Sequence, residues 1–571
     1  MRATLPLAQT GVIAAQIERS PGIDRVRTLN DGFAAATGDT ITAIVDEAAR
    51  YASDWLGPLN DAADAQGCKI VHGRLKTPAG HRAAWDAFVA NGWSTLDHPE
   101  EEGGQALPLA LATAVQEVFD RSCPAFGMLA VPQRSAARLI RAHGDAAMRA
   151  EWLPRLVAGE WGATICISEP EAGSDIGRLR TRAEPNVDGS WSITGEKVWI
   201  SFGDHDLTSR IGHCLLARTP SGAGLSLFLV PDMLSDGTRN AIALRRIEEK
   251  MGLHGSPTCA LGFEGAAGWM IGTEGRGLAQ MFVMITNMRL SVGVQGLGIA
   301  SAAADVAWGY AAERKQGGPP AAPVTLDRHA DVQRMLMDSA ARVDCLRGLI
   351  QAAANMADIA AFSADAEERE NASALAQWLL PIVKTTGGEY AFENASDAMQ
   401  VLGGAGYTRE WPAEQALRDA RVLTIFEGTT GIQGLDLAHR RLVRGDRRGY
   451  SAFLAEARRT AVSCPVPEAA RFVRALGLFE QASQQLIGKV DVPRDIDAGA
   501  TAYLHLAALV ATGWIAAHQA SFKATDPDTR RLVATGRYWL SAIDDRAALL
   551  AAQATAGAEA LSRYDAIASV R

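Results

Sequence analysis

The sequence predicts an α+β fold in which helical and β segments are segregated along the chain, and three observations support this. Helical periodicity governs residues 40–152, for example in "LALATAVQEVFDRS", where apolar residues recur at spacings of three and four. Short runs rich in β-formers, such as "HCLLART" and "LSLFLVP", follow between Gly162 and Gly272. Helical periodicity returns after Gly277. This order is typical of separate helical and β layers and not of alternating βαβ units.

These changes of character predict four domains in the 571 residues, a length that exceeds what a single core usually serves. We expect an N-terminal helical domain at 1–160, a middle β domain at 161–277, a helical bundle at 278–446 and a helical extension at 447–571. Within the middle domain, "NVDG" between "RLRTRAEP" and "SWSIT" predicts a β-hairpin.

The extension shows three helical patterns, which the breaks "VDVPRD" and "TDPDT" separate. They lie at about 467–489, 497–523 and 528–564. Upstream, in the predicted helical bundle, many small residues indicate closely packed helices.

Composition and charge argue against two classes of protein. A formal net charge of -9 disfavours nucleic acid or an anionic membrane as the main partner, because phosphate binding needs a basic face. The longest apolar run, Ala502–Ala517, is shorter than the roughly 20 residues of a membrane span. We therefore expect a buried helix there and no integral membrane association.

Cysteine usage and the N-terminus bear on the compartment. The seven cysteines lie far apart and form no C-x-x-C pair, which is typical of reduced thiols. The N-terminal segment is a poor signal peptide, because its apolar run is interrupted by Pro6 and Gly11. We expect a cytoplasmic protein.

Three polar or aromatic segments of the β region could carry chemistry, and each also has a purely structural interpretation. The turn "SEPEAGSD" at 168–175 offers small hydroxyls and a glycine that let backbone N–H groups approach an anion. In "EKVWIS" at 196–201, Trp199 stands at the expected end of a strand, where an indole is more often part of the core. The triplet Asp204-His205-Asp206 is expected to form a solvated loop without a metal.

The segment "RVLTIFEGTTG" at 421–431 sets one carboxylate, Glu427, between an apolar run and a Gly-Thr-Thr-Gly. A carboxylate in an apolar pocket loses solvation, so its pKa rises and it becomes suited to proton abstraction. Alternatively, Glu427 caps or pairs locally near the start of the following helix. Position alone leaves both interpretations open.

Five motifs in this order resemble the acyl-CoA dehydrogenase family of flavoproteins. They are "SEPEAGSD", "ITGEKVWIS", "YAAERK", "QVLGGAGY" and "IFEGTTGIQ", and the resemblance covers about residues 40–444. Further segments, including "EEKMGLHGSPTC" and "GVQGLGIA", together with the C-terminal extension, look most similar to the 3-methylmercaptopropionyl-CoA dehydrogenase group.

The resemblance implies an acyl-CoA dehydrogenase fold with FAD extended between the β domain and the helical bundle. It implies an oxidoreductase of fatty acid metabolism that removes the α-proton and β-hydride of an acyl-CoA to give a trans-2-enoyl-CoA. Electrons would pass to an electron-transfer flavoprotein, and the substrate would be 3-(methylthio)propanoyl-CoA or a fatty acyl-CoA. A homodimer is expected, because the family's cofactor reaches a second subunit.

The family's functional residues can be carried over by position. Glu427 matches the catalytic base, and Met288 stands where one branch carries its glutamate instead, which leaves Glu427 as the candidate. Substrate-binding positions are matched by Ser174, Arg289 and Gly428. The positions expected to bind FAD are Ile165, Ile167, Ser168, Gly173, Ser174, Trp199, Ile200, Ser201, Arg314, Gln400, Gly403, Gly404, Thr429, Thr430 and Gly431.

The chain departs from the family's sequence pattern at two places, and two alternative functions stay open. Many members continue "RKTFG" or "RKQFG" after the arginine, whereas this chain has 316–320 as Gln-Gly-Gly-Pro-Pro, and Gly431 replaces a frequent glutamine. An acyl-CoA oxidase that uses oxygen would share the base and flavin. A DNA-binding, non-catalytic flavoprotein of the same fold is disfavoured by the mixed charges beyond residue 450.

Overall fold

The computed structural model describes residues 3–570, which fall into two compact units. The helical unit comprises Met1–Ala49, Pro108–Arg121 and Val292–Arg571. The β-containing unit comprises Arg50–Leu107 and Ser122–Ser291. Each unit consists of segments that are far apart in the sequence, so the two units do not correspond to consecutive stretches of the chain. The four-domain division above stays a prediction.

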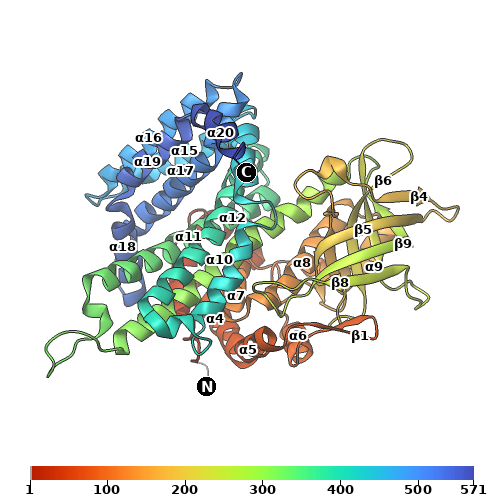
Figure 1. The fold of residues 1–571 in the computed structure, drawn as a ribbon, viewed down its shortest axis with the longest axis horizontal. Helices are drawn as coiled ribbons and strands as arrows, with labels where there is room; N and C mark the ends of the chain where they lie inside the picture. The colour runs from red at the N-terminus through yellow and green to blue at the C-terminus, as the bar shows by residue number, and fades with distance from the viewer. Residues whose placement is uncertain (1–2, 571) are drawn as a thin grey trace. The chain divides into compact units, whose positions relative to one another are not determined.

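The β-containing unit is built around one sheet (Figure 1). Its strands follow the order β3-β6-β4-β5-β9-β7, β8 pairs with β9, and pairing of β6 with β7 closes the path from β6 to β7 into a ring. The predicted hairpin is confirmed, because β4 and β5 are antiparallel and the Asn186 N–H donates to Ser190 O at 2.8 Å. The strands are β3 (Gly162–Cys166), β4 (Arg182–Pro185), β5 (Trp191–Ser201), β6 (Ile211–Arg218), β7 (Leu225–Pro231), β8 (Ile242–Ile247) and β9 (Thr258–Ile271).

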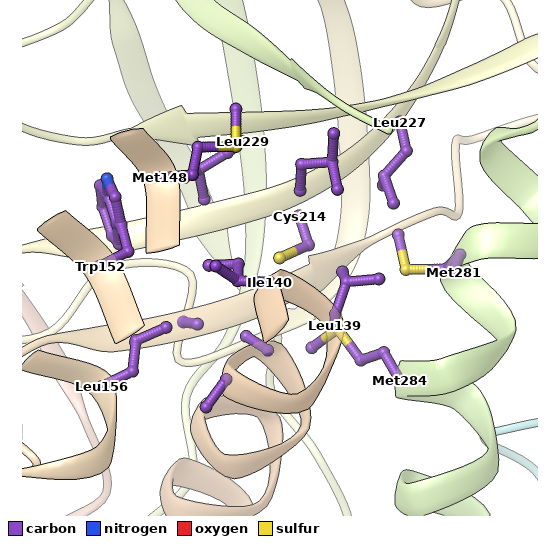
Figure 2. Close-up of a cluster of buried hydrophobic side chains, with 14 of the residues drawn as sticks. Leu139, Ile140, Met148, Trp152, Leu156, Cys214, Leu227, Leu229, Met281 and Met284 are labelled. Atoms are coloured by element: carbon purple, nitrogen blue, oxygen red, sulfur yellow. The ribbon is translucent and has the colours of Figure 1, made fainter. Parts of the chain in front are cut away.

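Helices α8 (Pro124–His143) and α9 (Ala146–Val157) cover one face of this sheet. Figure 2 shows the apolar cluster that joins helices to strands, and its labelled members are Leu139, Ile140, Met148, Trp152, Leu156, Cys214, Leu227, Leu229, Met281 and Met284. Alternate residues of the same strands, such as Phe228, belong to a second cluster on the other face. Burial of both faces explains why "CLLA" and "LFLV" are continuous apolar runs and do not alternate.

The N-terminal part of this unit differs from the expected all-helical pattern. Helices α5 (Gly57–Gln66) and α6 (His81–Ala90) flank a small hairpin of β1 (Lys69–Val71) and β2 (Arg74–Lys76). The hairpin is too short for periodicity to reveal it.

The expectation that Asp204-His205-Asp206 forms a solvated loop is wrong. The Asp204 carboxylate accepts from Arg74 Nε at 2.8 Å and from the Leu75 N–H at 2.9 Å, while Asp206 accepts from Thr77 Oγ1 at 2.8 Å. Asp204 and His205 are buried. These acidic side chains hold the small hairpin, a long-range role that local composition cannot show.

The helical unit is dominated by the long helices α10, α11 and α12, to which the C-terminal helices belong. The close packing expected from small residues is confirmed, since a Cβ on Gly296 of α10 would lie 2.2 Å from Gly387 O of α12. Its helices, wholly or in greater part, are α1 (Thr10–Ile17), α2 (Ile23–Val26), α3 (Asp31–Ala34), α4 (Gly38–Tyr51), α7 (Leu109–Ser122), α10 (Gly277–Glu313), α11 (Ala330–Phe362), α12 (Ala366–Leu402), α13 (Ala413–Ala420), α14 (Thr430–Leu435), α15 (Arg448–Ser463), α16 (Ala469–Ile487), α17 (Pro493–Ala520), α18 (Pro527–Leu540), α19 (Ile543–Thr555) and α20 (Tyr564–Ala568).

The extension contains more helices than the three expected patterns (Figure 1). Helix α15 was not predicted, and the pattern at 528–564 is divided, because α18 ends at Leu540 and α19 begins at Ile543. The break carries no proline or glycine, which is why the pattern appears continuous in the sequence.

Two helices in the described part of the chain, α10 and α17, are long and apolar enough to cross a membrane by composition alone. The most apolar window of α10 is 89% buried inside the fold, and that of α17 is 83% buried. The buried helix expected at Ala502–Ala517 is thereby confirmed, and core packing accounts for the apolar character of both helices.

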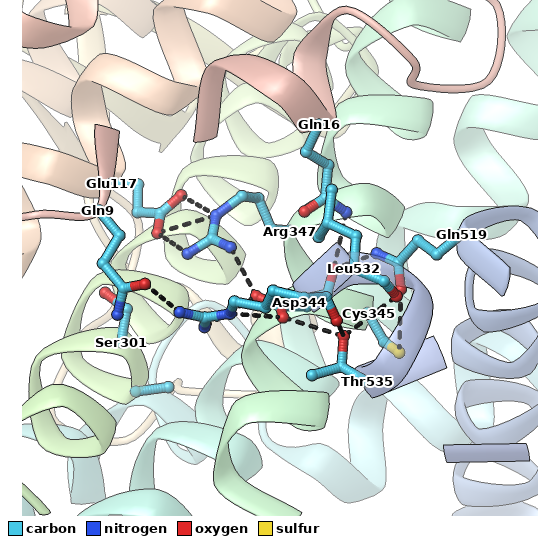
Figure 3. A network of polar contacts seen from close by, with 12 residues as sticks. Gln9, Gln16, Glu117, Ser301, Asp344, Cys345, Arg347, Gln519, Leu532 and Thr535 are labelled. Atoms are coloured by element: carbon cyan, nitrogen blue, oxygen red, sulfur yellow. Dashed lines mark hydrogen bonds and ion pairs between the residues drawn. The ribbon is translucent and has the colours of Figure 1, made fainter. Parts of the chain in front are cut away.

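A buried ionic network fastens the extension to the rest of the helical unit (Figure 3). Arg347 of α11 donates to Glu117 of α7 at 2.7 Å and to Asp344 at 3.0 Å. Asp344 also accepts from Arg531 Nε of α18 at 3.1 Å and from Thr535 Oγ1 at 3.0 Å. Neutralisation by paired groups is what makes such burial of charge tolerable.

Four buried histidines should make the β-containing unit sensitive to acid. Burial lowers the pKa of His81 and His213 to about 4 and that of His98 and His205 to about 3. Unfolded histidines take up protons below about pH 6.5, so the unfolded state binds more protons between pH 6.5 and 4. Stability is therefore fully present above pH 6.5 and is lost as the pH falls through this window.

We expect His213→Gln to reduce this loss. His213 Nδ1 lies 2.8 Å from Thr164 Oγ1, and a glutamine can keep that hydrogen bond without titrating. Urea unfolding of the holoprotein from pH 7.5 to 4.5 should show a decline that is smaller in the variant, by up to about 3 kcal/mol. His72→Gln, on an exposed turn, is the matched control and should follow the wild type. Parallel curves for wild type and His213→Gln would contradict the account.

Candidate active site

The loop that carries Glu427 begins after a short 3₁₀ turn (Arg421–Thr424) and ends at α14. Glu427 is half-buried and has a φ of 54°, and Gly428 follows at 90°. Glycine adopts this region freely, but for a glutamate it stores backbone strain. Non-glycine residues held in this way concentrate at functional sites, where the surrounding structure fixes them.

Three contacts fix the loop. The Lys384 ammonium, which is fully buried on α12, donates to Gly428 O at 2.7 Å. Gln433 Nε2 of α14 donates back to Glu427 O at 3.0 Å. Thr429 is the N-cap of α14, and its hydroxyl accepts from the Ile432 N–H at 3.3 Å. The capping position considered for Glu427 is therefore occupied by Thr429, whereas the role as a base stays a prediction.

In the β-containing unit, the structure brings two predicted flavin-binding segments together. The Val198 N–H of β5 donates to Ser168 O, just beyond β3, at 3.0 Å. A β-bulge between Lys197 and Ile200 gives Trp199 a φ of 64° and leaves its indole 62% exposed. Trp199 was expected at the end of a strand, but β5 continues to Ser201 through the bulge.

A buried ion pair that sequence reasoning missed joins the same two segments. Lys197 Nζ donates to Glu169 Oε1 at 2.8 Å and to Ile167 O at 3.0 Å. Burial opposes ionisation of Glu169, but the Lys197 charge and the hydrogen bonds from Thr181 and the Arg180 N–H outweigh it and hold the pKa of Glu169 below its usual value. Both residues lie inside the quoted motifs, but only three-dimensional structure shows that they face each other.

The other predicted positions of the β-containing unit are less enclosed. Gly173 and Ser174 are exposed in the turn after the short antiparallel bridge between Glu169 and Ala172. Arg289 is half-buried on α10, beside the buried Met288.

The remaining positions of the helical unit divide into two groups. Thr430 and Gly431 open α14 directly after the Glu427 loop. Arg314 follows the end of α10, while Gln400, Gly403 and Gly404 lie at the end of α12, and all four are exposed. Apolar residues near the two helix ends pack in one cluster, so the structure brings these four positions to one end of the helical unit. The Glu427 loop contacts α12 at a different place, Lys384.

These features fit a flavin nucleotide. The two paired segments carry the apolar side chains of Ile165, Ile167 and the exposed Trp199 together with the hydroxyls of Ser168 and Ser201, a mixture that suits a flat aromatic ring with polar edges. At the end of α12, a Cβ on Gly403 or Gly404 would meet nothing within 4 Å among the described atoms, so another molecule can approach the backbone there. The forked cation of Arg314 suits a phosphate.

Comparison with known families identifies the class of protein. The N-terminal, middle and C-terminal domain models of acyl-CoA dehydrogenase match residues 39–160, 164–266 and 275–442. The chain is 35% identical over 498 residues to 3-methylmercaptopropionyl-CoA dehydrogenase of Ruegeria pomeroyi, covering 83% of this chain and 84% of that protein. The chain belongs to the acyl-CoA dehydrogenase family.

Other relatives carry different names. The chain is 36% identical to the broad-specificity linear acyl-CoA dehydrogenase FadE5 of Mycobacterium tuberculosis, over 64% of each chain. Among solved structures, Caenorhabditis elegans ACDH-11 in complex with C11-CoA has a TM-score of 0.78 at 19% identity, covering 95% of this chain and 92% of that one. An acyl-CoA dehydrogenase of Bacillus anthracis complexed with FAD has a TM-score of 0.76, also at 19% identity, with coverage of 95% and 91%.

The predicted family, fold and enzyme class are thereby confirmed. The chain has the acyl-CoA dehydrogenase fold, with a β middle region, a helical bundle and additional C-terminal helices. It is an oxidoreductase and a flavoprotein that uses FAD.

Proposed function

We propose that this enzyme oxidises the Cα–Cβ bond of an acyl-CoA thioester to a trans-2-enoyl-CoA, with Glu427 as the base. The observation that supports this most strongly is the Glu427 loop, where the half-buried Glu427 is held at positive φ by hydrogen bonds to its own carbonyl oxygen and to that of Gly428. A base must be held still at the α-carbon, and a loop anchored at both carbonyls provides that rigidity.

The chain's residues then have distinct tasks. Glu427 accepts the α-proton, and its backbone N–H polarises the thioester carbonyl, so that negative charge on the oxygen is stabilised as the proton leaves. Bound FAD supplies the acceptor for the β-hydride. Ser174 and Arg289 contact the thioester arm, and the segments around Ser168 and Trp199 hold the ring.

The remaining cofactor positions serve the nucleotide. Thr429, Thr430 and Gly431 lie at the start of α14, where the backbone N–H groups and the Thr429 hydroxyl suit a diphosphate. Arg314, Gln400, Gly403 and Gly404 serve the cofactor of a second copy of the chain, in a cytoplasmic homodimer. Their exposure in the single chain supports this assignment.

The names of two relatives bear on the choice of substrate. They specify a 3-methylmercaptopropionyl-CoA and linear acyl-CoAs. We therefore place 3-(methylthio)propanoyl-CoA and linear fatty acyl-CoAs first among substrates. As the electron acceptor we propose an electron-transfer flavoprotein.

Anaerobic titration of the purified yellow holoprotein with a panel of acyl-CoA thioesters tests the proposal. We expect bleaching of the flavin by at least one of these substrates, and slow reoxidation when oxygen is admitted. Fast reoxidation would favour an oxidase. Failure of every thioester to bleach the flavin, together with a shift of duplex DNA in a gel at physiological salt, would favour the non-catalytic DNA-binding alternative.

A further inference from the structure

Helix α17 of the C-terminal extension lies directly against the segment that follows Glu427. Near its start, Asp497 Oδ1 accepts from His439 Nε2 at 2.7 Å. One turn further, a Cβ on Gly434 of α14 would lie 2.9 Å from Ala500 O and 3.1 Å from Thr501 N. The two backbones therefore touch, and only a glycine allows this approach.

A third contact lies another turn along the same helix. His505 Nε2 donates to Glu389 Oε1 of α12 at 3.0 Å, and Thr430 Oγ1 of α14 donates to the same oxygen at 3.3 Å. The hydrogen bond to Glu389 raises the pKa of His505 despite its partial burial, which favours the charged pair.

The three contact points share one face of α17. Asp497, Thr501 and His505 are spaced by four residues, a spacing that brings side chains onto one stripe of a helix. They meet residues 430–439 in reverse order, because Asp497 contacts His439, the backbone at Thr501 contacts Gly434, and His505 reaches Thr430 through Glu389. Since Thr430 is three residues from Glu427, a fixed α14 limits where the carboxylate can move.

We propose that the C-terminal extension is a positioning element of the active site, and that His505, acting through Glu389, holds Thr430 and thereby the Glu427 loop. His505 is a positioning residue in this account and does not touch the substrate. The proposal rests on the proposed role of Glu427 as the base. It gives the extension a task in catalysis, in addition to its packing against α11 and α12.

His505→Leu tests the proposal, because leucine preserves the helix and removes the donor to Glu389. We expect kcat to fall about tenfold while KM changes less than about twofold, since misplacement of a reacting group affects the chemical step more than binding. Backbone amides of residues 427–434 should also exchange with deuterium faster in the variant. His505→Gln, whose amide can donate to Glu389, should restore most of the rate.

His518→Leu is the matched control on the same helix. His518 Nε2 donates to Arg19 O at 2.7 Å, away from the loop, so this variant should keep wild-type kcat and wild-type exchange of residues 427–434. Gly434→Ala gives an independent arm, because its Cβ would displace α14 from Ala500, whereas Gly477→Ala on α16 meets nothing within 4 Å among the described atoms. We expect the first to lower kcat and the second to leave it unchanged.

The outcomes separate this proposal from the one on which it rests. Wild-type kcat and wild-type exchange in both His505→Leu and Gly434→Ala would overturn the role of the extension. Equal losses in His505→Leu and His518→Leu would also overturn it, because the effect would then be one of general packing. Retention of full activity by Glu427→Gln would instead refute the assignment of the base.

Discussion

Glu427→Gln should lower the rate of flavin reduction by acyl-CoA about 10²–10⁴-fold, the range usual for removal of a general base. Glutamine keeps the length and polarity of the side chain, and the hydrogen bonds from Lys384 and Gln433 run to backbone carbonyl oxygens of the loop, so the fold should be unchanged. Rapid mixing of the anaerobic holoprotein with substrate, followed at the flavin absorbance, measures the rate directly.

Glu101→Gln provides the control for this experiment. Glu101 is exposed in the β-containing unit. In the Glu101→Gln variant, the substrate should therefore reduce the flavin at the wild-type rate. Binding of substrate by Glu427→Gln should persist, because the thioester arm does not depend on the carboxylate. Reduction at the wild-type rate by Glu427→Gln would show that another group removes the proton.

Arg347→Met should destabilise the helical unit by about 3–5 kcal/mol, the usual cost of leaving a buried charge without its partner. Arg347 is 5% exposed at its side chain and is paired with Glu117 and Asp344, which are 2% and 0% exposed. Methionine fills similar volume, so the loss reports the charges more than a cavity. The urea midpoint of the holoprotein measures the effect.

The comparison variant for Arg347 is Arg448→Met. Arg448 and Glu370 form an ion pair at the surface, with side chains 47% and 63% exposed, where solvent and salt screen the attraction. Its midpoint should be nearly unchanged. A urea midpoint for Arg347→Met that is as close to the wild-type value as that of Arg448→Met would mean that the buried network contributes little to the stability of the unit.

The sequence predicted the class of fold because periodicity and turn chemistry are local. The "NVDG" turn between "RLRTRAEP" and "SWSIT" defines the β4–β5 hairpin without reference to the rest of the chain. The β1–β2 hairpin was missed because it is short and because its supports are distant in the sequence: the N–H groups of Leu75 and of Thr77, just after β2, donate to Asp204 and Asp206. The division between α18 and α19 was missed because no glycine or proline marks it.

The candidate site shows the same contrast between features that a local sequence signal reveals and features that depend on long-range contacts. The resemblance located Glu427 and Trp199, and the structure adds a feature that sequence could not supply, namely that both have positive φ. Lys384, Lys197 and His505 carry no local signal of their contacts, because each partner lies on a different element. The apolar run of α17 predicted a buried helix, but it did not predict that one face of this helix contacts the residues after Glu427.

The central claim is that the Glu427 carboxylate removes the α-proton, and deuterium incorporation tests it most directly. An acyl-CoA analogue with sulfur in place of the β-carbon has no β-hydrogen, so proton removal is the only step it can undergo. After incubation with the holoprotein in D2O, mass spectrometry should find deuterium at the α-carbon with the wild type and only background exchange with Glu427→Gln. Equal incorporation by both proteins would contradict the account.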